Sequence, residues 1–104
     1  MKILTAVLAL AAGAAFVAAP VSASEALLKK YNCTACHAID KKLVGPAYKE
    51  VAKKYAGDAG AEKMLAEKVK KGGKGNWGQV PMPPNPTVPD ADVTAMIQYI
   101  LQLK

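Results

Sequence analysis

The two cysteines and the single histidine of this chain fall within five positions, as Cys33, Cys36 and His37. Residues three and four apart share one face of a helix, so the two thiols would lie one turn apart with the imidazole beside them. This C-x-x-C-H pattern is typical of c-type haem attachment. A neutral imidazole is also a common axial ligand of haem iron. The motif therefore predicts one haem c, attached through Cys33 and Cys36, with His37 as the proximal ligand.

Other uses of these residues account less well for the sequence. A closed zinc site needs four Cys or His ligands, whereas the chain has three such residues and only Asp40 as a nearby carboxylate. A thioredoxin-like dithiol is usually found near a βαβ pattern, and no strand run is evident. A disulfide across so short a loop would add little stability, because loop-closure entropy grows with loop length. A dithiol redox module without haem is nevertheless kept as an alternative function, and it predicts a colourless protein.

The first residues are typical of a secretory signal peptide. A positive start at Lys2 precedes the uncharged run 3–19, and Val21-Ser22-Ala23 offers small residues for cleavage. We expect a signal peptide over residues 1–23, and a single domain over residues 24–104 that is exported to the periplasm. A retained membrane anchor is the alternative, because the apolar run approaches spanning length. No later segment is expected to span a membrane.

Helical periodicity predicts an all-α domain of about four short helices packed around one covalently attached haem. Ser24 is a suitable N-cap for the first helix, which leads into the attachment motif. A second helix is expected to begin near Pro46, because proline suits a first helical turn, and to be capped by Gly57. The apolar positions expected in the core are Leu28, Tyr31, Tyr48, Val51, Ala52, Tyr55, Met64, Leu65, Val69, Val93, Met96, Ile97, Ile100 and Leu101.

A proline-rich loop is expected between the last two helices. The third helix is predicted over residues 61–71, and the last begins after Asp90 as N-cap. Residues 72–89 contain five prolines and therefore do not form a helix. Met82 is flanked by prolines, which stiffen the backbone and lower the entropy lost when the side chain is held in place. A thioether on a rigid loop suits a distal iron ligand.

The other methionines are weaker candidates for that ligand. Met1 belongs to the predicted signal peptide, and Met64 and Met96 lie on apolar helix faces, where methionine ordinarily fills the core. His/Met ligation fills both axial positions of the iron, raises the reduction potential and leaves no open site for a substrate. A labile sixth ligand would instead indicate a haem enzyme or a gas-binding sensor, which is the chief alternative function.

Three separated segments are similar to those of the small monohaem class I cytochromes c of bacterial periplasms, the c-551 and c-552 group. The segments are CTACHAID (33–40), VGPAYK (44–49) and WGQVPMPPN (77–85). The similarity covers essentially all of residues 24–104, in order and with the family's spacing. It implies the cytochrome c fold and an electron carrier rather than an enzyme, which cycles Fe(II) and Fe(III) by one-electron outer-sphere transfer.

The same resemblance implies roles for further residues. Pro46 would accept a hydrogen bond from the other ring nitrogen of His37, which fixes ring orientation and basicity. Asn85 would donate a hydrogen bond to the sulfur of Met82. Trp77 would donate its indole N–H to a haem propionate, although a lone tryptophan that belongs simply to the core would also seek a partner for that group.

The charge of the chain suggests its partners. All 14 basic residues are lysines and the net charge is +6. The absence of arginine, the preferred reader of bases, argues against nucleic acid. Steering toward acidic redox partners is the simplest use of the charge. The resemblance suggests a quinol-oxidising complex or another cytochrome as donor, and a nitrite reductase, peroxidase or terminal oxidase as acceptor. We expect a monomer.

We expect two roles for lysines near the haem. Family members often place a basic residue near a haem propionate, and Lys68 is the candidate here, although lysine lacks the planar fork of arginine. The lysines that we expect around an exposed haem edge are Lys29, Lys30, Lys41, Lys42, Lys70, Lys71 and Lys74.

Overall fold

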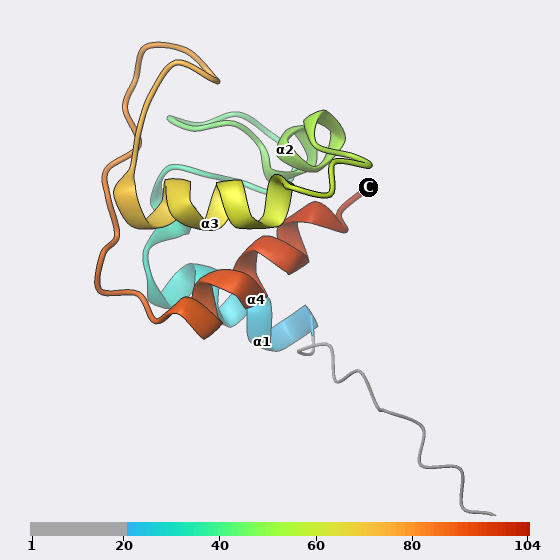
Figure 1. Cartoon of the computed structure of the whole chain (residues 1–104), viewed down its shortest axis with the longest axis vertical. Helices are drawn as coiled ribbons and strands as arrows, with labels where there is room; N and C mark the ends of the chain where they lie inside the picture. The colour runs from blue at the N-terminus through green and yellow to red at the C-terminus, as the bar shows by residue number, and fades with distance from the viewer. Residues whose placement is uncertain (1–20) are drawn as a thin grey trace, which may run out of the picture.

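This computed structural model describes residues 21–104 of the chain (Figure 1). The range contains four α-helices and one short 3-10 helix. In chain order they are α1 (Val21–Lys30), η1 (Cys33–Ala35), α2 (Tyr48–Lys54), α3 (Ala61–Lys71) and α4 (Asp90–Leu101). Within residues 21–104 the only strand-like pairing consists of isolated bridges, from His37 to Lys42 and from Gly73 to Met82. The all-α prediction is confirmed.

The predicted signal peptide falls outside the described residues, apart from its last three, which begin α1. No helix within residues 21–104 has the length and the apolar character needed to cross a bilayer. The assignment of a signal peptide to residues 1–23 stays a prediction.

The ends of the helices agree with the sequence signals in one case and differ in three. Helix α3 covers the predicted range, and Gly72 ends it with φ 71°. Ser24 lies inside α1 instead of at its N-cap, because the helix continues back to Val21 in the full chain and buries this side chain. The prediction that Gly57 caps α2 is wrong, because the helix already ends at Lys54 and Gly57 belongs to the following turn.

Asp90 is the first residue of α4 and not its N-cap, which is Pro89. Oδ1 of Asp90 lies 3.0 Å from Nζ of Lys70, a residue of α3. The carboxylate that was expected to bond the first N–H groups of the helix forms this ion pair and makes no cap bond.

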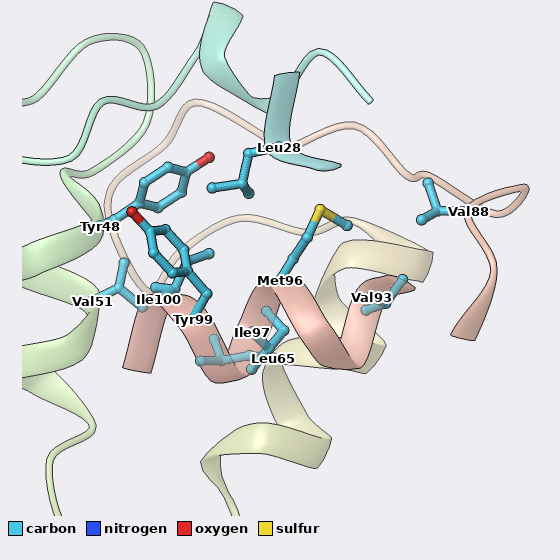
Figure 2. Packing of buried hydrophobic residues seen from close by; sticks show 10 residues of the cluster. All are labelled: Leu28, Tyr48, Val51, Leu65, Val88, Val93, Met96, Ile97, Tyr99 and Ile100. Carbon is cyan, nitrogen blue, oxygen red and sulfur yellow. The ribbon is translucent and has the colours of Figure 1, made fainter. Parts of the chain in front are cut away.

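Helix α4 is the centre of the core, because it packs against α1, α2 and α3 (Figure 1). Figure 2 shows side chains of α1, α2 and α3 gathered around those of α4. The buried cluster consists of Leu28, Tyr48, Val51, Leu65, Val88, Val93, Met96, Ile97, Tyr99 and Ile100. Two members, Val88 and Tyr99, were not predicted from the periodicity, since Val88 belongs to the proline-rich loop. That loop leaves the end of α3, turns back and passes it again to reach the start of α4.

Two tyrosine hydroxyls bond carboxylates across the interface of α1 and α4. The hydroxyl of Tyr31, just past the end of α1, donates to Oδ2 of Asp92 at 2.6 Å. The hydroxyl of Tyr99, near the end of α4, donates to Oε1 of Glu25 at 2.6 Å. The two bonds tie the two ends of the interface. Burial, and then the bond to Glu25, raise the pKa of Tyr99 to about 12.

Changing Tyr99 to phenylalanine is expected to lower the free energy of unfolding by about 1.5 kcal/mol, the lower end for a hydrogen bond to a charged group. It should also flatten the pH dependence of stability between about pH 10 and 12. In that window the unfolded chain has already released the Tyr99 proton while the folded chain retains it, so stability falls as the pH rises. Urea unfolding across this range measures both effects. Tyr55→Phe is the control, and equal slopes for Tyr99→Phe and wild type would contradict the assignment.

Candidate functional site

A cavity of about 230 Å³ lies between the cysteine–histidine segment, the helices and the proline-rich loop. Much of its wall is apolar and comes from the core, including Leu28, Val51, Leu65, Met96, Ile97 and Ile100. The residues predicted to form the site that line this cavity are Cys33, Cys36, His37, Pro46, Lys68, Trp77 and Met82. The remaining one, Asn85, is not part of the lining. Residues far apart in the sequence therefore meet around a single apolar space.

The two thiols and the imidazole are displayed by one tight turn. Asn32 has a left-handed backbone with φ 58°, a conformation that asparagine tolerates, and it separates η1 from α1. The backbone N–H groups of Cys36 and His37 both donate to the carbonyl of Cys33, at 3.2 and 3.0 Å. The motif thus lies on its own 3-10 turn instead of the end of the first helix. Burial raises the pKa of the Cys33 thiol.

His37 is held by the segment that follows the motif in the sequence. Its Nδ1 lies 2.8 Å from the carbonyl oxygen of Pro46. When Nδ1–H donates this bond, Nε2 keeps its lone pair and can bind a metal. Gly45 lies close to the ring, since an added Cβ there would stand 2.8 Å from Nδ1 and 2.9 Å from Nε2. The ring also stacks on Tyr48, with centroids 5.1 Å apart and planes inclined by 20°.

Met82 is anchored by its backbone to the end of α3. The N–H of Met82 donates to the carbonyl of Gly73 at 2.8 Å, and the N–H of Gly73 donates back at 3.1 Å. Three residues on, the N–H of Asn85 donates to the carbonyl of Val69 at 3.0 Å. The C-terminal end of α3 therefore determines where the methionine side chain starts.

The side chain of Asn85 strengthens this anchorage. Its Nδ2 donates to the carbonyls of Val69 at 3.3 Å and Pro83 at 3.2 Å. Both amide hydrogens have acceptors in this arrangement, so the predicted donation to the sulfur of Met82 would require one of them to move. That donation stays a prediction.

Two lysines act on the loop in ways that the sequence did not reveal. Nζ of Lys54 lies 4.6 Å above the ring of Trp77 and donates to the carbonyl of Asn76 at 3.1 Å. Nζ of Lys70 donates to the carbonyl of Val88 at 2.5 Å and pairs with Asp90. Lys70 thus anchors the far end of the loop. Its part in a docking surface stays a prediction. No local pattern separates these two lysines from the other twelve.

Comparison with known proteins places the chain in a family. Residues 21–104 match the family model described as Cytochrome c. The chain is 54% identical over 87 residues to cytochrome c-551 of Allochromatium vinosum, covering 84% of this chain and 93% of the relative. It is 51% identical over 94 residues to cytochrome c-552 of Nitrosomonas europaea, covering 90% of this chain and 91% of the relative.

Solved structures agree with these relatives. The crystal structure of wild-type Nitrosomonas europaea cytochrome c552 is similar with a TM-score of 0.74 and 52% identity, covering 77% of this chain and 99% of that one. The class 1 cytochrome MtoD of Sideroxydans lithotrophicus ES-1 is similar with a TM-score of 0.68 and 31% identity, covering 80% of this chain and 95% of that one.

The residues around the cavity fit the covalently attached haem c of a cytochrome c. Cys33 and Cys36 present two thiols at the spacing of haem attachment, and the wall between them and Met82 is largely apolar. The cofactor is thus haem c, attached through Cys33 and Cys36. On the family match and these relatives, the chain belongs to the cytochrome c family, among the small electron-carrying class I cytochromes c-551 and c-552.

Proposed function

We propose that this protein is a periplasmic carrier of single electrons, in which Nε2 of His37 and the sulfur of Met82 are the two axial ligands of one haem iron. The haem supplies the Fe(II)/Fe(III) couple when bound. The observation that carries the proposal is the meeting of His37 and Met82 at the cavity that also contains both cysteines. With His37 and Met82 both bound to the iron, the haem would have no free position for a substrate and would exchange electrons by outer-sphere transfer.

Each ligand is positioned by a backbone contact. The carbonyl of Pro46 accepts a hydrogen bond from Nδ1 of His37, which orients the ring and raises the basicity of Nε2. The paired bonds between Met82 and Gly73 hold the thioether on the loop. A methionine ligand raises the reduction potential, and an apolar wall raises it further by excluding water. These features favour a carrier that accepts electrons readily.

Trp77 and Lys68 are proposed to bind a haem propionate. Both line the cavity, and each side chain ends in an N–H donor suited to a carboxylate. Lys54, stacked on the indole, supports this arrangement by holding Trp77 in place. Asn85 is proposed to tune Met82, either directly or through the loop turn that it ties to α3.

The docking face is proposed to combine apolar contact with positive charge. Val44 and Val80 line the cavity while being 56% and 64% exposed. Lysines near this mouth, including Lys42 and Lys74, would attract an acidic redox partner, an effect that weakens with salt. Candidate donors are a quinol-oxidising complex or another cytochrome, and candidate acceptors are a nitrite reductase, a peroxidase or a terminal oxidase. The carrier is proposed to act as a monomer after removal of residues 1–23.

Changing Met82 to alanine tests the proposed ligand set. The variant is expected to lose the low-spin, methionine-ligated spectrum and to lower the reduction potential on the order of 0.1 V, since axial ligation sets haem potentials over about 0.8 V. Optical spectra of oxidised and reduced protein from the periplasm, with a mass measurement for one covalent haem, provide the comparison. Met64→Leu is the matched control, because it removes a thioether from the partly buried face of α3.

The alternatives have distinct outcomes in this experiment. A wild-type protein whose sixth ligand is labile at neutral pH would favour a haem enzyme or a gas-binding sensor. A colourless protein without haem mass would indicate a dithiol module. A Met82→Ala spectrum identical to wild type would rule out methionine ligation by this residue.

A further inference from the structure

We propose that Tyr48 is a positioning residue whose aromatic ring fixes the plane of the His37 imidazole. The inference rests on the proposed ligation by His37 and adds a residue that controls how this ligand is oriented. The two rings stack with centroids 5.1 Å apart and an interplanar angle of 20°. Offset stacking of aromatic rings is favourable beyond the area that it buries, so each ring restricts the rotation of the other.

The tyrosine ring is itself immobilised. Tyr48 is the first residue of α2 and is 4% exposed. Figure 2 shows its side chain in the core cluster, with Tyr99, Val51 and Leu28 around it. Its backbone N–H donates to the carbonyl of Ala38 at 2.9 Å, which ties the start of α2 to the attachment segment. A ring held in this way is a fixed surface for a neighbouring imidazole.

The other contacts of His37 leave a freedom that Tyr48 removes. The bond from Nδ1 to the carbonyl of Pro46 holds one atom of the ring. A single hydrogen bond still permits the ring to rotate about the axis of that bond. Gly45 offers a close backbone wall without a side chain. The segment 45–48 thus supplies a wall, an acceptor and a stacking face to one imidazole. Its own position is fixed by the bond from the N–H of Gly45 to the carbonyl of Cys36 at 2.7 Å.

The aromatic ring, and not the hydroxyl, carries this role. The hydroxyl makes no hydrogen bond to any part of the chain that the structure describes, so it does not contribute to holding His37. Phenylalanine would present the same ring face. An aliphatic side chain of similar bulk would fill much of the space and offer no flat surface. The two replacements therefore separate orientation of the ligand from filling of the core.

The experiment compares Tyr48→Phe and Tyr48→Leu in the haem-loaded protein, with Tyr99→Leu as the matched control. Tyr99 is a tyrosine of the same core that does not stack on His37, so its replacement removes a core ring, together with the hydrogen bond to Glu25, and leaves the stacked pair in place. The readout is the electron paramagnetic resonance spectrum of the ferric protein, because its g values depend on the plane of the axial imidazole. Urea unfolding of the same samples measures the packing loss.

Tyr48→Leu is expected to shift and broaden the largest g value, while Tyr48→Phe and Tyr99→Leu keep the wild-type spectrum. In the reduced wild-type protein, nuclear Overhauser contacts between the Tyr48 and His37 ring protons are expected, and this measurement needs no variant to fold. The proposal is overturned by an unchanged spectrum for Tyr48→Leu, by equal shifts in the Phe and Leu variants, by an equal shift for Tyr99→Leu, or by absence of those contacts. A wild-type spectrum without histidine–methionine ligation would instead overturn the proposed function on which the inference rests.

Discussion

Replacing Gly72 by alanine is expected to displace Met82 and to lower the free energy of unfolding by about 3 kcal/mol. Gly72 has φ 71° and ψ −171°, a backbone region that is essentially restricted to glycine and costs another residue about 1–3 kcal/mol. An added Cβ would also stand 2.5 Å from the carbonyl oxygen of Met82 and 2.9 Å from the nitrogen of Pro84. These are backbone atoms of a proline-stiffened segment, which yields less readily than a side chain, and such overpacking typically costs about 1–3 kcal/mol.

Gly57→Ala is the matched control for this prediction. Gly57 also has a positive φ, of 75°, but an added Cβ there meets nothing within 4 Å. It should show the backbone cost alone, about 1–2 kcal/mol, and an unchanged haem spectrum. Urea unfolding and the optical spectrum of the ferric protein measure the two effects. If Gly72→Ala were no less stable than Gly57→Ala and kept methionine ligation, the close contact with Met82 would have no consequence.

Replacing Gly45 by alanine is expected to move the His37 ring and to cost about 1–3 kcal/mol, as overpacking typically does. The added Cβ would stand 2.8 Å from Nδ1 and 2.9 Å from Nε2, and still closer to Cε1. The ring cannot withdraw freely, because Nδ1 is bonded to Pro46 and the turn of the motif fixes the backbone of His37. A weakened bond from Nδ1 would lower the basicity of Nε2, so the reduction potential should change together with the stability.

Gly60→Ala is the control for the Gly45 variant. The nearest atom to an added Cβ at Gly60 is Oδ1 of Asp58 at 3.5 Å, an ordinary contact, so only a small loss at the start of α3 is expected. Potentiometry and urea unfolding distinguish the two variants. A Gly45→Ala protein with the potential and stability of Gly60→Ala would show that the His37 ring has room to move.

The sequence predicted the class of fold and one helix almost completely. Helix α3 runs over residues 61–71 as expected, because its periodicity and its terminating Gly72 are both local signals. Periodicity also assigned most of the core. It missed Val88, which is buried from a loop, and it missed the pairing of Lys70 with Asp90 between α3 and α4. Such contacts join residues that have no regular spacing in the chain.

Within the site, the sequence identified the attachment residues, and the structure was needed for the contacts around the ligands. The identity of the attachment residues was legible from the sequence, because Cys33, Cys36 and His37 are neighbours and their spacing alone places them on one turn. The surroundings of the ligands were not. The stacking of Tyr48 on His37, the stacking of Lys54 on Trp77 and the two carbonyl acceptors of Asn85 appear only in the folded chain.

The amino-acid sequence by itself determined the chemistry of this protein, namely two thiols, an imidazole and a thioether, together with the helices that bury an apolar core. Only the tertiary structure decided how those groups meet, since His37 and Met82 are far apart in the sequence and line the same cavity. The physical reason is the separation along the chain of the residues that interact. Helical spacing and haem attachment depend on residues within one or two turns. The orientation of each ligand depends on backbone carbonyls and ring faces that packing brings from elsewhere.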